Sequence, residues 1–295
     1  MELRQARYVV AVAEERSFSK AAMRLHLAQP SLSQQIAKLE KAWGVTLFHR
    51  LSNQIELTDA GERFVQVARD LIDQAEGLER EMRSYASVET GKLLIGSLPI
   101  TGAHVLPKVL SQFHQLYPGI ELQLVEDRSS ELESLLLRGK LDVSLLTMPI
   151  TDPFLRIEPI IHEEIYLAVP PHHPLAEHDE VSLELAADQP FILLKEGQGF
   201  RQISLNLCQQ AGFKPRIVFE SSNIQTVQSL VAAGMGISFV PQMITRSPWV
   251  TDTPVYIRLQ SRPMRTLVMA VHKDRHLSTA VKAFMDILRQ ATHSF

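Results

Sequence analysis

The chain has 295 residues, an apolar content of 45% and a formal net charge of −3, which is enough length and apolar material for two or three compact units. The overall charge does not indicate a nucleic-acid-binding protein. However, residues 1–57 carry 8 Lys and Arg against 5 Asp and Glu, whereas the remainder carries 22 against 28. The basic excess therefore lies at the N-terminal end, and it is so small that tight binding to a polyanion would need more than one copy.

Targeting and redox features are few. The charged start is not followed by an apolar stretch of signal-peptide length, and no run approaches a membrane span. The single Cys208 cannot form an internal disulfide. We therefore expect a cytoplasmic protein that has no membrane partner.

Residues 18–40 have the pattern of two short helices joined by a tight turn. Pro30 suits the first turn of the second helix, because its missing N–H would have no partner there. The apolar positions lie on one face of each helix, at spacings of three and four. These are Ala21, Ala22, Leu25, Leu32, Ile36 and Leu39. The start of the second helix carries short hydrogen-bonding side chains, as a recognition helix in the DNA major groove requires.

The residues that follow decide between this interpretation and an ordinary antiparallel helix pair with a polar outer face. Gly44 ends the helix, residues 45–50 are extended, residues 51–54 form a turn and residues 55–58 return. A helix-turn-helix followed by a small hairpin is a winged helix, and Arg50 on the wing is placed to meet a phosphate.

The first third of the chain resembles the LysR-type transcriptional regulators at many positions with fixed spacing. These are Ala21-Ala22, Gln29-Pro30-Ser31-Leu32-Ser33, Ile36, Leu39-Glu40, Gly44-Val45-x-Leu47-Phe48-x-Arg50 and Leu57-Thr58-x-Ala60-Gly61. The resemblance implies a regulator that binds double-stranded DNA as a homodimer, and it carries the family's expectation of a homotetramer. We expect the DNA contacts to come from Ser19, Gln29, Pro30, Ser31, Ser33, Gln34, Lys38 and Arg50.

A long helix is predicted over residues 58–87, after the winged helix-turn-helix domain of residues 1–57. Its apolar residues recur at steps of three and four in an eleven-residue repeat, which is typical of a straight or slightly right-handed pairing. Such a narrow stripe must be buried, either on its own domain in the first turns or against a second copy. LysR-type proteins dimerise through this element. The predicted dimer residues are Phe64, Val67, Leu71, Leu78 and Met82.

Residues 88–91 are predicted to be a hinge, and strands and helices alternate through residues 92–295. Two crossings between the halves predict lobe I from residues 92–162 and 267–295, and lobe II from residues 163–266. The fold class is therefore α/β, with an N-terminal all-α winged helix-turn-helix and an effector domain of two doubly wound α/β lobes. This is a periplasmic-binding-protein-like form, and LysR-type effector domains share it.

Ligands of open parallel sheets bind beyond the carboxyl ends of the strands, where helix N-termini point. The loops 96–102, 195–201 and 220–223 offer hydroxyls, glycines and free N–H groups there, which suit an anion, although such residues are also ordinary helix caps. Arg201 is placed to pair with a carboxylate, while Glu196 argues against an anion. With the residues that the family resemblance adds, the predicted effector site is Ser97, Leu98, Pro99, Ile100, Thr101, Thr147, Met148, Glu196, Gly197, Gln198, Phe200, Arg201 and Ser222. We expect a small metabolite, an organic anion rather than a cation.

Other chemistry is weakly supported by the sequence. We interpret His162, His172, His173 and His178 as belonging to a solvated loop and not to a metal site, because they lack regular helical spacing. Cys208 has no resolving partner for a redox switch. No Ser–His–Asp or paired-carboxylate arrangement is visible, so we expect neither an enzyme nor a cofactor. A purely structural DNA-bending protein would not need two α/β lobes.

Overall fold

The computed structural model of the chain describes residues 1–51, 54–86, 91–245 and 253–293. The chain divides into two units, which are treated separately below. The first comprises residues 1–83, and the second begins at Ser84. Within the described ranges, no helix combines the length and the apolarity needed to cross a bilayer.

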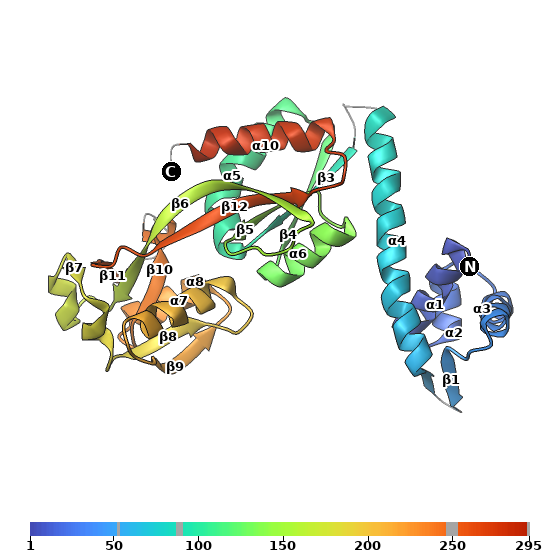
Figure 1. The fold of residues 1–295 in the computed structure, drawn as a ribbon, viewed down its shortest axis with the longest axis horizontal. Helices are drawn as coiled ribbons and strands as arrows, with labels where there is room; N and C mark the ends of the chain where they lie inside the picture. Colours follow the sequence, from blue (N-terminus) through green and yellow to red (C-terminus); the bar gives the residue numbers. More distant parts are fainter. Residues whose placement is uncertain (52–53, 87–90, 246–252, 294–295) are drawn as a thin grey trace. The chain divides into compact units, whose positions relative to one another are not determined.

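The first unit begins with a winged helix-turn-helix (Figure 1). Its elements are α1 (Leu3–Glu15), α2 (Phe18–Arg24), α3 (Gln29–Trp43), β1 (Phe48–Leu51) and β2 (Gln54–Leu57). The two strands pair antiparallel, with Phe48 opposite Leu57. The predicted helix pair and hairpin are confirmed, and α1 is an additional helix that the sequence analysis did not identify.

Apolar residues from the three helices and the wing form one core in this unit. The rings of Phe18 and Phe48 meet edge to face with centroids 5.8 Å apart, which joins α2 to the wing. Helix α3 ends at Gly44, whose φ of 67° lies in the left-handed region that favours glycine. The chain can therefore turn sharply from α3 into the wing.

Helix α4 (Asp59–Ala86) follows the wing and agrees with the predicted long helix. Thr58 caps it: its hydroxyl accepts the N–H of Gly61 at 3.0 Å and donates to the carbonyl of Thr46 at 2.6 Å. A Cβ at Gly61 would overlap the Leu47 carbonyl, so only glycine lets the first turn of α4 pack this closely on the wing. Of the predicted hinge, residues 88–90 lie outside the described part, and Gly91 begins the next strand.

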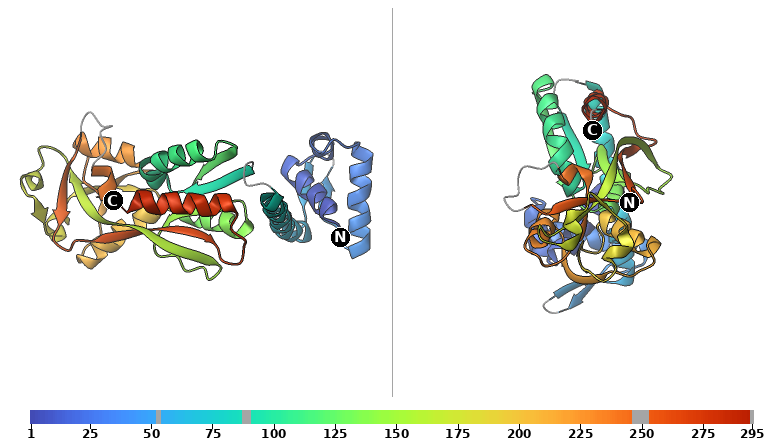
Figure 2. Two further views of the ribbon diagram at one scale, coloured as in Figure 1. Left: turned by 90° about the horizontal axis from the view of Figure 1, so that it is seen from above. Right: turned by 90° about the vertical axis from the view of Figure 1, so that its left-hand side faces the viewer.

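Lobe I of the second unit contains a mixed sheet in the order β4-β3-β5-β12-β6. Its elements are β3 (Gly91–Ser97), α5 (Pro99–Leu116), β4 (Ile120–Glu126), α6 (Ser129–Arg138), β5 (Val143–Thr147), β6 (Leu155–Val169), β12 (Met264–His272) and α10 (Thr279–Thr292). Strands β4, β3 and β5 are parallel, whereas β12 runs antiparallel to β5 and β6. Helix α10 lies beside α5, with the ring of Phe284 6.0 Å from that of Phe113 (Figure 2).

Lobe II is built on the parallel pair β8–β9 and on short strands that add to β6. Its elements are β7 (Glu180–Val181), β8 (Pro190–Leu194), α7 (Gly199–Gln210), β9 (Arg216–Ser221), α8 (Ile224–Ala232), β10 (Ser238–Pro241), α9 (Gln242–Thr245) and β11 (Val255–Leu259), with short 3₁₀ helices at Pro174–Glu177 and Leu183–Ala186. Strand β11 was not predicted.

Two long strands, β6 and β12, link the lobes (Figure 1). The predicted crossings lie inside them, and the two strands pair from Met264 opposite Glu164 to His272 opposite Leu155. A continuous apolar core extends from one lobe to the other. The predicted two-lobed α/β fold class is confirmed, and a hinge made of paired strands lies between its halves.

Candidate functional site

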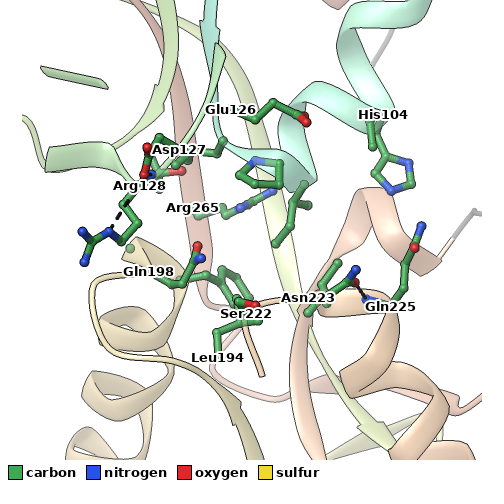
Figure 3. A pocket seen from close by; sticks show the side chains of 18 residues that line it. His104, Glu126, Asp127, Arg128, Leu194, Gln198, Ser222, Asn223, Gln225 and Arg265 are labelled. Carbon is green, nitrogen blue, oxygen red and sulfur yellow. Dashed lines mark hydrogen bonds and ion pairs between the residues drawn. The ribbon is translucent and has the colours of Figure 1, made fainter. Parts of the chain in front are cut away.

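A cavity of about 480 Å³ lies between the two lobes of the second unit (Figure 3). Its size falls in the range of small-molecule sites. Both lobes and the return strand β12 contribute to its walls. The lining residues are Leu98, Pro99, Ile100, Ala103, His104, Glu126, Asp127, Arg128, Thr147, Leu194, Gln198, Gly199, Phe200, Ser222, Asn223, Ile224, Gln225 and Arg265.

Four helices begin at this cavity, α5, α6, α7 and α8, and the first turns of α5 and α7 are uncapped in the described structure. The side chain of Asn223 caps α8 by accepting the N–H of Gln225 at 2.7 Å. Helices α5 and α7 have no side-chain cap. The first N–H groups of a helix have no partner within it and carry partial positive charge. The starts of α5 and α7 can therefore donate to an anionic or carbonyl oxygen in the cavity.

Thr147, at the end of β5, presents a polar atom that lacks a partner. Its side chain lines the cavity, the residue is only 6% exposed, and its Oγ1 has no hydrogen-bond partner in the described part of the chain. Buried hydroxyls are nearly always hydrogen-bonded. An oxygen or nitrogen of a bound molecule would satisfy this one.

A buried ion pair forms the floor of the cavity. Arg265 lies on β12 and Glu163 on β6, and both residues are 4% exposed. The Nε and Nη2 atoms of Arg265 lie 2.7 and 2.5 Å from Oε1 of Glu163. Oε2 of Glu163 accepts the N–H of Met243 at 2.7 Å, and the guanidinium lies 5.3 Å from the ring centroid of Phe200. The pair joins the hinge strands to lobe II.

The end of β4 and the loop after it bring three charged residues to the cavity wall: Glu126, Asp127 and Arg128. Asp127 uses its carboxylate locally, because Oδ1 accepts the N–H of Arg128 at 2.7 Å. His104 lies on the α5 side of the cavity (Figure 3). Burial is the main cause that lowers the pKa of His104, and Arg265 adds to the effect. The imidazole is therefore neutral at pH 7.

Seven of the predicted effector residues line the cavity: Leu98, Pro99, Ile100, Thr147, Gln198, Phe200 and Ser222. The other six do not. Ser97 is fully buried, and its hydroxyl donates to the carbonyl of Leu98 at 3.0 Å. Thr101 is also fully buried, within the first turn of α5. Met148, Glu196 and Gly197 lie outside the lining set.

Arg201 departs most clearly from its expected role as a partner for a ligand carboxylate. Its Nη1 donates to the carbonyl of Leu194 at 2.7 Å and pairs with the carboxylate of Glu220. Both partners lie at the ends of the lobe II strands. Arg201 therefore ties β8 to β9 and does not line the cavity.

The sequence analysis missed several charged and polar lining residues: His104, Glu126, Asp127, Arg128 and Arg265. Asn223 lies in the loop 220–223, which it did predict. Residues 126–128 directly follow a predicted parallel strand, so the carboxyl-end rule could have found them. Arg265 had no local signal, because it lies on the antiparallel return strand and its partner is 102 residues away.

The predicted DNA-contacting residues lie mostly on the outer surface of α2 and α3. Ser19, Gln29, Pro30, Ser31, Gln34 and Lys38 are exposed, and Ser33 is half-buried. The backbone of Arg50 lies in β1 opposite Ile55, but its side chain lies outside the described part. Helix α3 therefore presents the polar face that a recognition helix needs.

The predicted dimer stripe on α4 divides into two parts. Phe64 is 9% exposed and packs beside Trp43 of its own chain, with ring centroids 5.4 Å apart. Val67, Leu71, Leu78 and Met82 are 40–57% exposed. An apolar groove of about 350 Å³ lies over α4 and the end of α3 and includes Val67 and Leu71. Phe64 is thus mostly covered within its own chain, and because it also lines this groove, its contact with a second chain stays a prediction.

The described part of the chain was predicted to hold neither a metal site nor a reactive thiol. Across the described residues, no three His, Cys, Asp or Glu side chains lie close enough together to hold a metal ion. His162 lies on β6, and His172, His173 and His178 lie on the segment around the first 3₁₀ helix. Cys208 on α7 is buried, and burial raises the pKa of its thiol to about 12.

Two family profiles together cover nearly the whole chain. Residues 3–62 match the profile described as "Bacterial regulatory helix-turn-helix protein, lysR family", and residues 86–293 match "LysR substrate binding domain". The HTH-type transcriptional regulator YcgK of Bacillus subtilis is 42% identical, over 99% of this chain and 95% of YcgK. The hydrogen peroxide-inducible genes activator of Dickeya chrysanthemi is 30% identical, over 98% of this chain and 95% of its own length.

A solved structure shares the architecture over the full length. CbnR, determined in complex with its target DNA, is similar with a TM-score of 0.74 and 26% identity, over 99% of this chain and all of CbnR. Domain order, fold and sequence thus agree from end to end, and the chain belongs to the LysR family of transcriptional regulators.

Proposed function

We propose that this regulator reads promoter DNA through the exposed start of α3 and responds to a small metabolite bound in the cavity between its lobes. The observation that carries the proposal is the cavity itself, where two uncapped helix starts lie near the unpartnered hydroxyl of Thr147. Such a set of donors fits a ligand that bears a carboxylate or a similar anionic group. The absence of any catalytic arrangement in the sequence and the regulatory names of its relatives lead us to propose binding without catalysis.

The assembly that we propose is a homodimer held by α4, as the groove at Val67 and Leu71 suggests, with a homotetramer as the further step that the family implies. Two heads on one double-stranded site would compensate for the small basic charge of each. A regulator of promoter DNA acts in the cytoplasm, where we place this chain. A ligand that favours one arrangement of the lobes shifts the population of DNA-bound states only as far as its differential affinity allows.

Replacing Thr147 by Val tests the cavity, because the change keeps the side-chain shape and removes the hydroxyl. We expect a loss of about tenfold in ligand affinity, the value of one buried hydrogen bond. Calorimetric titration with carboxylic acids, amino acids and neutral metabolites measures it. Thr226→Val on the exposed face of α8 is the matched control and should change nothing. Unchanged ligand affinity in Thr147→Val would remove the cavity from the proposal.

Substitutions at two exposed residues of α3 distinguish recognition of the DNA sequence from electrostatic attraction to the phosphates. Gln34→Ala should change the preferred DNA sequence, because amide side chains bond to base edges. Lys38→Ala should weaken binding to all sequences alike and reduce the salt slope by about one unit. Fluorescence anisotropy with specific and random duplexes at several salt concentrations distinguishes the two effects. An unchanged affinity and preference in Gln34→Ala would contradict the assignment of α3.

The similarity to a peroxide-inducible activator raises thiol oxidation as a second candidate function, and the environment of Cys208 argues against it. The thiolate is the reactive form, and a pKa of about 12 leaves only about one thiol in 10⁵ ionised at pH 7. We expect Cys208 of the native chain to stay unmodified in peroxide, and to react with a disulfide reagent only after unfolding. Mass spectrometry would detect the opposite result as a sulfenic acid adduct on Cys208.

A further inference from the structure

The cavity has one end that favours an anion. A Cβ placed on Gly197 would lie 2.6 Å from Nη1 of Arg128, so the guanidinium lies against the turn that precedes α7. The uncapped start of α7 is at the same end. The buried Oγ of Ser129, which has no partner among the described residues, lies 3.4 Å from the position of a Cβ on Gly199. A cation, a hydroxyl and free N–H groups therefore meet at this end. The carboxylate of Asp127 also lies there, with Oδ1 3.9 Å from Nε of Arg128, but this contact is longer than a hydrogen bond and both side chains are about half exposed, so it compensates the Arg128 charge only weakly.

The other end carries a carboxylate. A Cβ placed on Gly102 would lie 2.5 Å from Oε1 of Glu126, so this carboxylate lies against the first turn of α5. In the described structure Glu126 forms no ion pair with an Arg or Lys. Figure 3 shows the Glu126 and Arg128 side chains extending in opposite directions, with Arg265 between them. A ligand anion placed at α5 would meet a like charge.

The groups in the middle of the cavity do not cancel the difference in charge between its Arg128 end and its Glu126 end. Arg265 is paired with the buried Glu163, so its charge is largely compensated, and His104 is neutral at pH 7 because burial lowers its pKa. A purely anionic ligand would leave Glu126 with only the partial positive charge of the α5 start as its counterpart. A purely cationic ligand would face Arg128 and the positive end of α7. Neither class satisfies both ends.

We infer that the ligand of this cavity is a small zwitterion, with its ammonium group at Glu126 and its carboxylate at Arg128 and the start of α7. The inference rests on the proposed function, that the cavity holds the effector, and it narrows the expected organic anion to a molecule of both charges. Such a ligand spans the lobes, because Glu126 belongs to lobe I and α7 to lobe II. Its binding energy would therefore depend on how the lobes are arranged.

Matched ligand triplets test the inference with the full-length chain. Each triplet consists of a zwitterion, the acid that lacks its amine and the amine that lacks its carboxylate. The two charges of each zwitterion must be separated by a chain long enough to reach both ends, so suitable sets are 4-aminobutanoate, butanoate and propylamine; 5-aminopentanoate, pentanoate and butylamine; and 6-aminohexanoate, hexanoate and pentylamine. In at least one triplet we expect the zwitterion to bind at least about tenfold more tightly than either analogue, because each charge-assisted hydrogen bond contributes that much or more.

Substitutions at the two ends of the cavity show which residue binds the ammonium group of the ligand and which binds its carboxylate. Glu126→Gln should weaken zwitterion binding about tenfold without weakening the acid, whereas Arg128→Gln should weaken the zwitterion and the acid without weakening the amine. Glu121→Gln is the matched control, since it removes the same charge from an exposed position of the same strand, where Glu121 pairs with Lys92 at 3.0 Å. It should leave every affinity unchanged.

Three outcomes would overturn the inference. One is an acid that binds as tightly as its zwitterion and binds more tightly to Glu126→Gln, which would identify an anion. Another is an amine that binds most tightly, which would identify a cation. The third is the absence of binding by every zwitterion at millimolar concentration. None of these removes the proposed function, which fails separately if a ligand of the chain binds equally well to Thr147→Val.

Discussion

Glu163→Gln is expected to destabilise the effector domain by about 3–5 kcal/mol, because it leaves the buried Arg265 without its counter-charge. Both residues are 4% exposed, so water cannot replace the lost carboxylate. The same carboxylate accepts the N–H of Met243, and a Gln side chain can keep that bond through its oxygen. The loss of stability in Glu163→Gln would therefore result from removal of the negative charge and not from a change in side-chain shape. A lower urea midpoint for the effector-domain transition would show it.

Two further variants isolate the cause of this loss. Glu164→Gln makes the same change at the next residue, whose partners Arg258 and Arg262 are about half exposed, and it should cost less than about 1 kcal/mol. The double variant Glu163→Leu with Arg265→Met removes both charges and should recover most of the lost stability. Equal midpoints for the wild type and Glu163→Gln would contradict a dry ion pair at the hinge.

Leu71→Asp is expected to give a monomer that still folds. Leu71 is 40% exposed and lies in the apolar groove over α4, so an Asp there costs little within one chain but would place a charge in the proposed interface. Loss of the second head should reduce specific DNA affinity by about 10²–10⁴, because the second contact is no longer intramolecular.

Light scattering and anisotropy on one palindromic duplex measure both parts of this prediction. Leu185→Asp, at an exposed position of the second unit, is the matched control and should remain a dimer with unchanged DNA affinity. If Leu71→Asp proves to be a dimer at micromolar concentration, α4 does not hold the protomers together at this point.

The helices and strands could be predicted because their residues follow local periodicities. The spacing of Leu32, Ile36 and Leu39 indicated α3, and the three residues are buried on one face. Helix α1 was missed because its buried run, Tyr8 to Val12, is continuous and rich in β-branched residues and so lacks a clear helical period. Strand β11 was missed because it follows no predicted helix and is defined by pairing with β6 and β7, which are distant in the sequence.

The site was only partly predictable, because long-range pairing decides which side chains remain available. Arg201 looked suitable for a ligand carboxylate, but Glu220, 19 residues later, binds its guanidinium. Arg265 reaches the cavity from the return strand and has no local motif. The exposure of Val67 and the burial of Phe64 likewise depend on how α4 packs on the wing, which the stripe of apolar residues could not distinguish.

Selection of binding sites from a random duplex library with the full-length chain shows whether the α3 helices of a dimer read a DNA sequence. We expect enrichment of a partly palindromic motif, with half-sites about one helical turn apart or a multiple of it. We also expect a changed half-site for Gln34→Ala. A selection that enriches no motif would contradict recognition by α3. So would one that enriches the same motif with the wild type and with Gln34→Ala.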